Sequence, residues 1–150
     1  MHNMCEKQKS ELLEPNVVLA DTLINSCTRE YLDGTGDIYL KFSSKLYQRP
    51  NGSRYMNVSW FVSGCQTTSK EFPFPAPCEM KITIWISEPI NLPAIVHQVP
   101  SSCTASGAEM IDVPSSGNYR TNVKLEARCY AYLPVKTLIA IQEGSCNCVI

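Results

Sequence analysis

The segment 37–64, DIYLKFSSKLYQRPNGSRYMNVSWFVSG, decides the fold because apolar residues recur in it at every second position. This period is typical of a β-strand with one buried face. The apolar positions are Ile38, Leu40 and Phe42, then Met56, Val58, Trp60 and Val62. Between the two runs, Pro50 fixes one backbone angle while Asn51 and Gly52 accept positive φ. The segment therefore predicts a β-hairpin.

The same period continues toward the C-terminus. Met80, Ile82, Ile84 and Ile86 alternate with polar residues, and so do Val123, Leu125, Ala127, Cys129 and Ala131. Residues 135–142 predict a partner strand for the latter, and 94–99 and 109–113 predict short strands. The prolines of 72–78, FPFPAPC, predict an extended connection instead.

Residues 15–31 carry a different period. Val17, Ala20, Ile24, Cys27 and Tyr31 recur at intervals of three and four, after Pro15 and before Gly34. Proline suits a helix start and glycine a helix stop, so this segment predicts one N-terminal helix with Cys27 on its buried face.

We therefore expect a mainly β (α+β) fold: an antiparallel β-sheet or sandwich of about six to seven short strands with one N-terminal helix. The 150 residues, 44% hydrophobic and 18% charged, suit a single domain spanning 1–150. Residues 1–14 are expected to be a flexible or irregular tail held by Cys5.

The cysteines predict that the fold is stapled by disulfides. Their even number and wide spread favour four bridges. They are Cys5, Cys27, Cys65, Cys78, Cys103, Cys129, Cys146 and Cys148. Structural zinc sites usually show two closely spaced pairs, but only Cys146 and Cys148 are close here, so no metal or other cofactor is expected. Prenylation is rejected because Asn147 occupies the fourth position from the end.

The closing Cys146-Asn147-Cys148 predicts two bridges to different partners. In an extended chain, side chains two apart lie on one face, so both sulfurs point toward one neighbouring layer. A C-x-C followed by an aliphatic residue also resembles the close of the cystine-knot growth factors. That resemblance implies two earlier cysteines a few residues apart, whereas Cys65 and Cys78 are 13 residues apart in the sequence. The knot remains a minor alternative.

Charge and hydropathy argue against a nucleic-acid partner and against membrane insertion. A net charge of −1 gives no field to attract phosphate or anionic lipid. No apolar run approaches the roughly 18 residues of a spanning helix. Residues 1–14 do not have the pattern of a signal peptide, and we expect that one was removed from a secreted chain.

No catalytic motif emerges from the sequence. His2 falls in the expected tail, and His97 lies between apolar neighbours, where a packed or edge-strand imidazole is favoured over a general base. Paired carboxylates remain an alternative, but Asp33 and Asp37 bracket a turn, and Glu109 and Asp112 lie near strand ends. We expect that the protein is not an enzyme.

Two acceptor triplets indicate a glycoprotein. Asn51-Gly-Ser lies at the hairpin tip and Asn57-Val-Ser within a strand. Asn51 is the better candidate because a hairpin tip is expected to be exposed. Glycosylation of Asn57 would require that its face of the strand points outward.

What remains is recognition. Aromatic side chains on rigid backbone recur at binding hot spots. The candidates for binding a partner are Phe72, Phe74, Trp85, Tyr130 and Tyr132. We expect a secreted, non-catalytic protein that acts by protein-protein recognition, as a pathogen-type effector with a role in virulence or as a signalling ligand. The alternative is a carrier that holds a small lipid-like ligand between its sheets.

Overall fold

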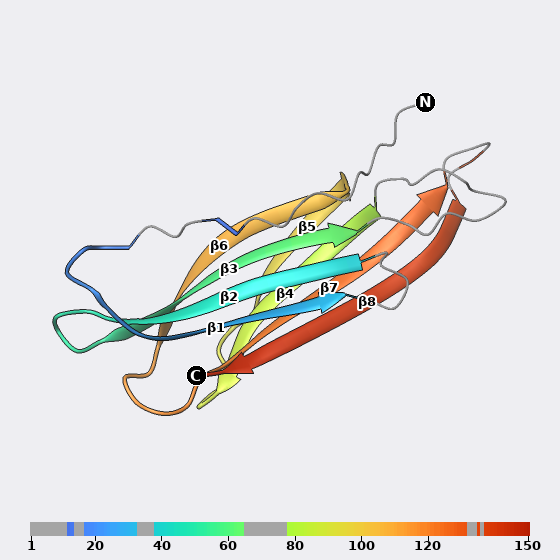
Figure 1. Ribbon diagram of the computed structural model, residues 1–150. Helices are drawn as coiled ribbons and strands as arrows, with labels where there is room; N and C mark the ends of the chain where they lie inside the picture. Colours follow the sequence, from blue (N-terminus) through green and yellow to red (C-terminus); the bar gives the residue numbers. More distant parts are fainter. Residues whose placement is uncertain (1–11, 14–16, 33–37, 65–77, 132–134, 136) are drawn as a thin grey trace.

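The computed structural model describes residues 12–13, 17–32, 38–64, 78–131, 135 and 137–150. These residues form two antiparallel sheets, which face each other as layers (Figure 1). Sheet 1 has the strand order β1-β2-β3-β6, and sheet 2 the order β5-β4-β7-β8. The strands are β1 (Thr22–Leu32), β2 (Ile38–Gln48), β3 (Arg54–Gly64), β4 (Cys78–Glu88), β5 (Ile95–Ser102), β6 (Thr104–Val113), β7 (Arg120–Ala131) and β8 (Thr137–Val149). The expectation of a mainly β protein is confirmed. Within the described ranges, no helix is long and apolar enough to cross a membrane.

The predicted hairpin is confirmed as β2 and β3. The two strands pair along their full length, from Ile38 opposite Gly64 to Gln48 opposite Arg54. At the turn, the Arg49 N–H donates to the Ser53 carbonyl at 2.8 Å and the Gly52 N–H donates to the Arg49 carbonyl at 2.9 Å. Gly52 has a φ of 90°, a conformation that side chains disfavour. Asn51 and Gly52 therefore lie in the tight turn of the hairpin, as the sequence predicted.

The predicted N-terminal helix is wrong. Thr22–Leu32 is strand β1, which pairs antiparallel with β2, and Cys27 lies opposite Ser44. Cys27 and Tyr31 are four residues apart, a spacing that fits one face of a helix and also one face of a strand. The β-branched Thr22, Ile24 and Thr28 favour the strand, and pairing with β2 gives its backbone a full set of partners.

The predicted strands of the C-terminal half are confirmed and are longer than expected. β7 pairs with both β4 and β8, and β8 continues through the closing C-x-C. β5 and β6 are separated only by Cys103, yet β5 belongs to sheet 2 and β6 to sheet 1. The chain therefore passes between the sheets at Cys103, where the Cys103 carbonyl accepts a hydrogen bond from the Gly64 N–H at 2.9 Å.

The core fills the space between the two sheets with the alternating residues that the sequence indicated. Side chains with no exposed surface include Leu40, Phe42, Met56, Val58, Val62, Ile82, Ile84, Ile86, Val123, Leu125 and Ala127. They form one cluster from both sheets. Burying each large aliphatic side chain contributes roughly 1.5–3 kcal/mol, so this cluster is the main favourable term in folding.

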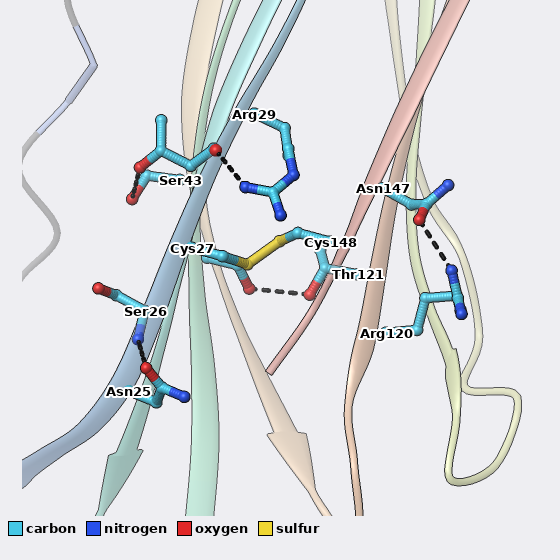
Figure 2. The surroundings of a disulfide bond; sticks show 11 residues. Asn25, Ser26, Cys27, Arg29, Ser43, Arg120, Thr121, Asn147 and Cys148 are labelled. Carbon is cyan, nitrogen blue, oxygen red and sulfur yellow. Dashed lines mark hydrogen bonds between the residues drawn. A yellow bond between two sulfur atoms is a disulfide. The ribbon is translucent and has the colours of Figure 1, made fainter.

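One edge of the sandwich is closed covalently. Cys27 of β1 and Cys148 of β8 form a disulfide that joins the two sheets (Figure 2). Next to it, the hydroxyls of Ser44 and Thr121 form a buried hydrogen bond of 2.8 Å between β2 and β7. Ser44 is the register partner of Cys27, and Thr121 is that of Cys148. The disulfide and the hydrogen bond therefore join the two sheets at the same position along their strands.

The opposite edge is closed by side chains. His97 of β5 and Glu109 of β6 approach at 2.5 Å between Nε2 and Oε1, which ties the outermost strand of sheet 2 to that of sheet 1. The His97 ring lies 5.2 Å from the ring of Trp60. Trp60 packs directly on Gly107, where any Cβ would collide with the indole. Glycine is thus required opposite the tryptophan.

Replacing both bridge cysteines, Cys27→Ala with Cys148→Ala, should lower the free energy of unfolding by about 2–4 kcal/mol because the unfolded chain loses a long closed loop. Chemical denaturation under non-reducing conditions measures this change. Cys146→Ala, two residues away on the same strand, is the matched control and should change the free energy much less. Equal losses in the two variants would contradict the proposed importance of the bridge.

Candidate functional site

A hollow lies on the outer face of sheet 2. It has a volume of about 540 Å³ and is lined by Glu79, Lys81, Glu126, Arg128, Ile141 and Glu143, among others. These side chains project from β4, β7 and β8 on the side away from the core, because they alternate with the buried residues of the same strands. We call this hollow the sheet-2 groove.

Strand register arranges the groove in two adjacent rows. In one row, Lys81 lies opposite Glu126, which lies opposite Glu143. The ammonium of Lys81 is 3.9 Å from the carboxylate of Glu126, and that of Lys124 is 3.6 Å from it. These ion pairs are partly exposed and contribute little to stability. Breaking these ion pairs costs little free energy, so Lys81, Lys124 and Glu126 can exchange them for contacts with a partner.

In the second row, Glu79 lies opposite Arg128, which lies opposite Ile141. The side chain of Ile141 is 60% exposed. Among the described residues, neither Arg128 nor Glu143 has an ion pair or a side-chain hydrogen bond. The groove thus offers a cation, an anion and an apolar side chain, all without a partner.

Two of the five aromatic residues expected to bind a partner lie on this face. The Tyr130 hydroxyl donates to the Glu79 carboxylate at 3.1 Å, at the end of the groove. Trp85 lies opposite Asn122, eight residues from Tyr130 along β7, which corresponds to about 27 Å. The two rings therefore share a face without forming one cluster. Phe72, Phe74 and Tyr132 lie outside the described residues.

The cysteines have different environments. Cys27 and Cys148 are bonded to each other, and Cys103 is also disulfide-bonded. Cys78 and Cys129 lie side by side, with sulfurs 2.6 Å apart. Cys5 and Cys65 are outside the described residues, so the expectation of four bridges stays a prediction for them.

Cys146 departs from the expectation of a bridge at every cysteine, because it is a thiol in this structure. Its sulfur does lie on the same face as that of Cys148, as the extended C-x-C predicted. Burial raises the pKa of Cys146 to about 11, and the nearby Arg29 of β1 opposes this increase. Between the two sheets, the charged neighbour of Cys146 is therefore the guanidinium of Arg29. A disulfide at this position would require a second cysteine instead.

Alkylation of Cys146 in the folded protein should be slow at pH 7 and should rise about tenfold per pH unit up to pH 9.5, because only the thiolate reacts. Brief labelling followed by mass spectrometry measures this rate. Arg29→Ala should slow the reaction further, since losing the cation raises the pKa. A rate that reaches its plateau below pH 9 would contradict the raised pKa.

The two candidate glycosylation sites differ in exposure. Asn51 is exposed at the hairpin tip, and its side-chain oxygen accepts hydrogen bonds from the N–H and the hydroxyl of Ser53 at 3.0 and 2.7 Å. Asn57 points away from the core but is only 3% exposed, and its buried side-chain nitrogen has no hydrogen-bond partner among the described residues. Attachment of a sugar therefore fits Asn51 and conflicts with the burial of Asn57.

Expression through a eukaryotic secretory pathway should attach one glycan at Asn51 and none at Asn57, because only the tip is accessible. The mass shift on enzymatic deglycosylation measures the occupancy. Asn51→Gln should abolish the shift, and Asn57→Gln should leave it intact. A shift that persists in Asn51→Gln would contradict this assignment.

The groups weighed for catalysis or metal binding have other partners. His97 lies on the edge strand β5 and is paired with Glu109, while Asp112 forms an ion pair with Arg49 at 2.9 Å. Asp33 and Asp37 lie outside the described residues, as does His2. Within the part of the chain that is described, no group of three or more metal-ligating side chains occurs. The side chains of His97, Glu109 and Asp112 are thus engaged in structural contacts.

Comparisons with known proteins identify no relative: no family model, curated protein or solved structure matches this chain. Any function must therefore be argued from the site alone. Sequence reasoning missed the groove, although one signal was present. In the sequences of β4 and β7, charged residues occupy every second position, at 79 and 81 and at 124, 126 and 128. This alternation predicts a charged outer face on both strands.

Proposed function

We propose that the chain is a secreted, non-catalytic protein that recognises another protein, with the sheet-2 groove as its contact surface. The observation that carries this proposal is that Arg128, Glu143 and the 60% exposed Ile141 lie in one hollow, where neither charged side chain has an ion pair or a side-chain hydrogen bond to any described residue. An arginine that becomes buried beside an apolar side chain when a partner binds is a common centre of a protein interface. Either an effector seen by a host or a signalling ligand would use such a surface.

The disulfide supports the secreted route. A bond between Cys27 and Cys148 persists in an oxidising compartment and is rare in the cytosol. Together with the exposed acceptor triplet at Asn51, it favours passage through a secretory pathway.

The carrier alternative gains no support from the core. The inner faces of both sheets contribute side chains with no exposed surface to one continuous cluster. The groove lies on the outer face of sheet 2, and a second, shallower hollow lies at the hairpin tip beside Asn51 and Val113. A lipid-like ligand between the sheets would have to displace this packing.

The proposal is tested by reversing the charges of the groove. Arg128→Glu with Glu143→Arg should weaken binding at least tenfold, because both charges would oppose their counterparts on the partner. Immobilised wild type and variant are incubated with extracellular fluid, and the bound proteins are compared by quantitative mass spectrometry. Any captured protein is then purified and its affinity for both forms is measured by calorimetry.

The matched control reverses two charges on sheet 1, Lys41→Glu with Glu30→Lys, which are register partners on β2 and β1. This variant should bind like the wild type. Equal binding by the groove variant and the wild type would place the contact surface elsewhere. The absence of any protein bound with micromolar or better affinity would overturn recognition itself.

A further inference from the structure

We propose that Cys78 and Cys129 form a disulfide that locks β4 to β7 directly beneath the sheet-2 groove. The two residues are register partners on neighbouring antiparallel strands. Directly opposite residues in such a pair have Cα atoms about 4.5 or 5.5 Å apart, and both values lie within the span of a disulfide.

The position of the two sulfurs supports the bond. They lie 2.6 Å apart, closer than two unbonded sulfur atoms normally approach. Both side chains point into the core and have no exposed surface. Because both positions face the same way on adjacent strands, a bond forms here without moving either backbone.

Other roles for the pair fit the structure less well. A catalytic or redox-active thiol must be reached by its substrate, whereas these sulfurs are fully buried. A metal site needs further ligands, and no cluster of three metal-ligating side chains occurs in the described ranges. The geometry therefore favours a permanent structural cross-link.

The bond would fix the strands that build the groove. Glu79 and Arg128 are the next register pair along β4 and β7, and both line the groove. Tyr130, which follows Cys129, holds Glu79 by a hydrogen bond of 3.1 Å. A cross-link one residue away keeps these charged groups in register, which lowers the ordering cost of binding a partner. The pairing itself does not depend on the proposed recognition.

Formation of the bond is a two-electron oxidation. The two thiols lose two protons and two electrons as the sulfur-sulfur bond forms. The electrons pass to a disulfide oxidant, either oxidised glutathione or a disulfide-exchange enzyme, which is reduced to two thiols through a mixed-disulfide intermediate. Because the product is buried, this exchange must occur before the two sheets close on each other.

Peptide mapping of the secreted protein tests the pairing. The protein is denatured and alkylated without reductant at pH 6.5, to prevent exchange, and is then digested with trypsin. Cleavage after Lys70, Lys81, Arg128 and Lys136 leaves Cys78 in peptide 71–81 and Cys129 in peptide 129–136. We expect these two peptides as one linked species. Recovery of both as alkylated thiols, or linked to other cysteines, would overturn the proposal.

The same digest contains its own controls. Peptides 10–29 and 137–150 should be linked through Cys27 and Cys148, with one alkyl group on Cys146. The variants Cys78→Ala, Cys129→Ala and the double variant provide a second measurement. If the bond exists, either single variant should lower Tm about as much as the double variant, whereas additive shifts would contradict it. If the variants fail to fold, the wild-type digest alone decides.

Discussion

The junction of β1 with β8 is the constraint on which the two-sheet arrangement depends. Most side chains of β1 are exposed, and only Cys27 and Tyr31 of this strand pack against the core. Burial of apolar side chains alone therefore attaches β1 only weakly to sheet 2. The Cys27–Cys148 disulfide supplies the missing link, and the Tyr31 ring packs on Gly144 of β8, where any Cβ would collide with it. Because β2 pairs with β1, this contact also positions the rest of sheet 1 along this edge of sheet 2.

The sequence predicted those parts of the fold that depend on local pattern. A strand with one buried face carries its own period, so the hairpin and the strands around Ile82 and Leu125 were recognisable from their alternation. The error at β1 arose where the pattern was ambiguous, since Cys27 and Tyr31 satisfy both periods. The β-branched residues of this segment favour the strand only weakly, and the pairing with β2, a contact distant in sequence, decides between strand and helix.

The groove and the cysteine pairing lay beyond sequence reasoning because both depend on which strands are neighbours. β4 and β7 pair although two strands separate them in the chain, and the chain crosses between sheets at Cys103. Once that order is known, Cys78 falls opposite Cys129, and Glu79 falls opposite Arg128. Trp85 and Tyr130 share the outer face of sheet 2, and both this shared face and their separation along it follow only from the strand order and register.

The two outer faces of the sandwich are not equivalent, and this difference favours sheet 2 as the surface for the proposed recognition. On the outer face of sheet 1, Tyr55, Asn57 and Phe61 of the central strand β3 are at most 7% exposed, so little of that strand can reach a partner. On sheet 2, by contrast, Arg128 of β7 is exposed. The hairpin tip that carries Asn51 lies at the opposite end of the molecule from the start of β4 and the end of β7, where the groove lies (Figure 1). A sugar at that tip would therefore leave the groove open to a protein partner.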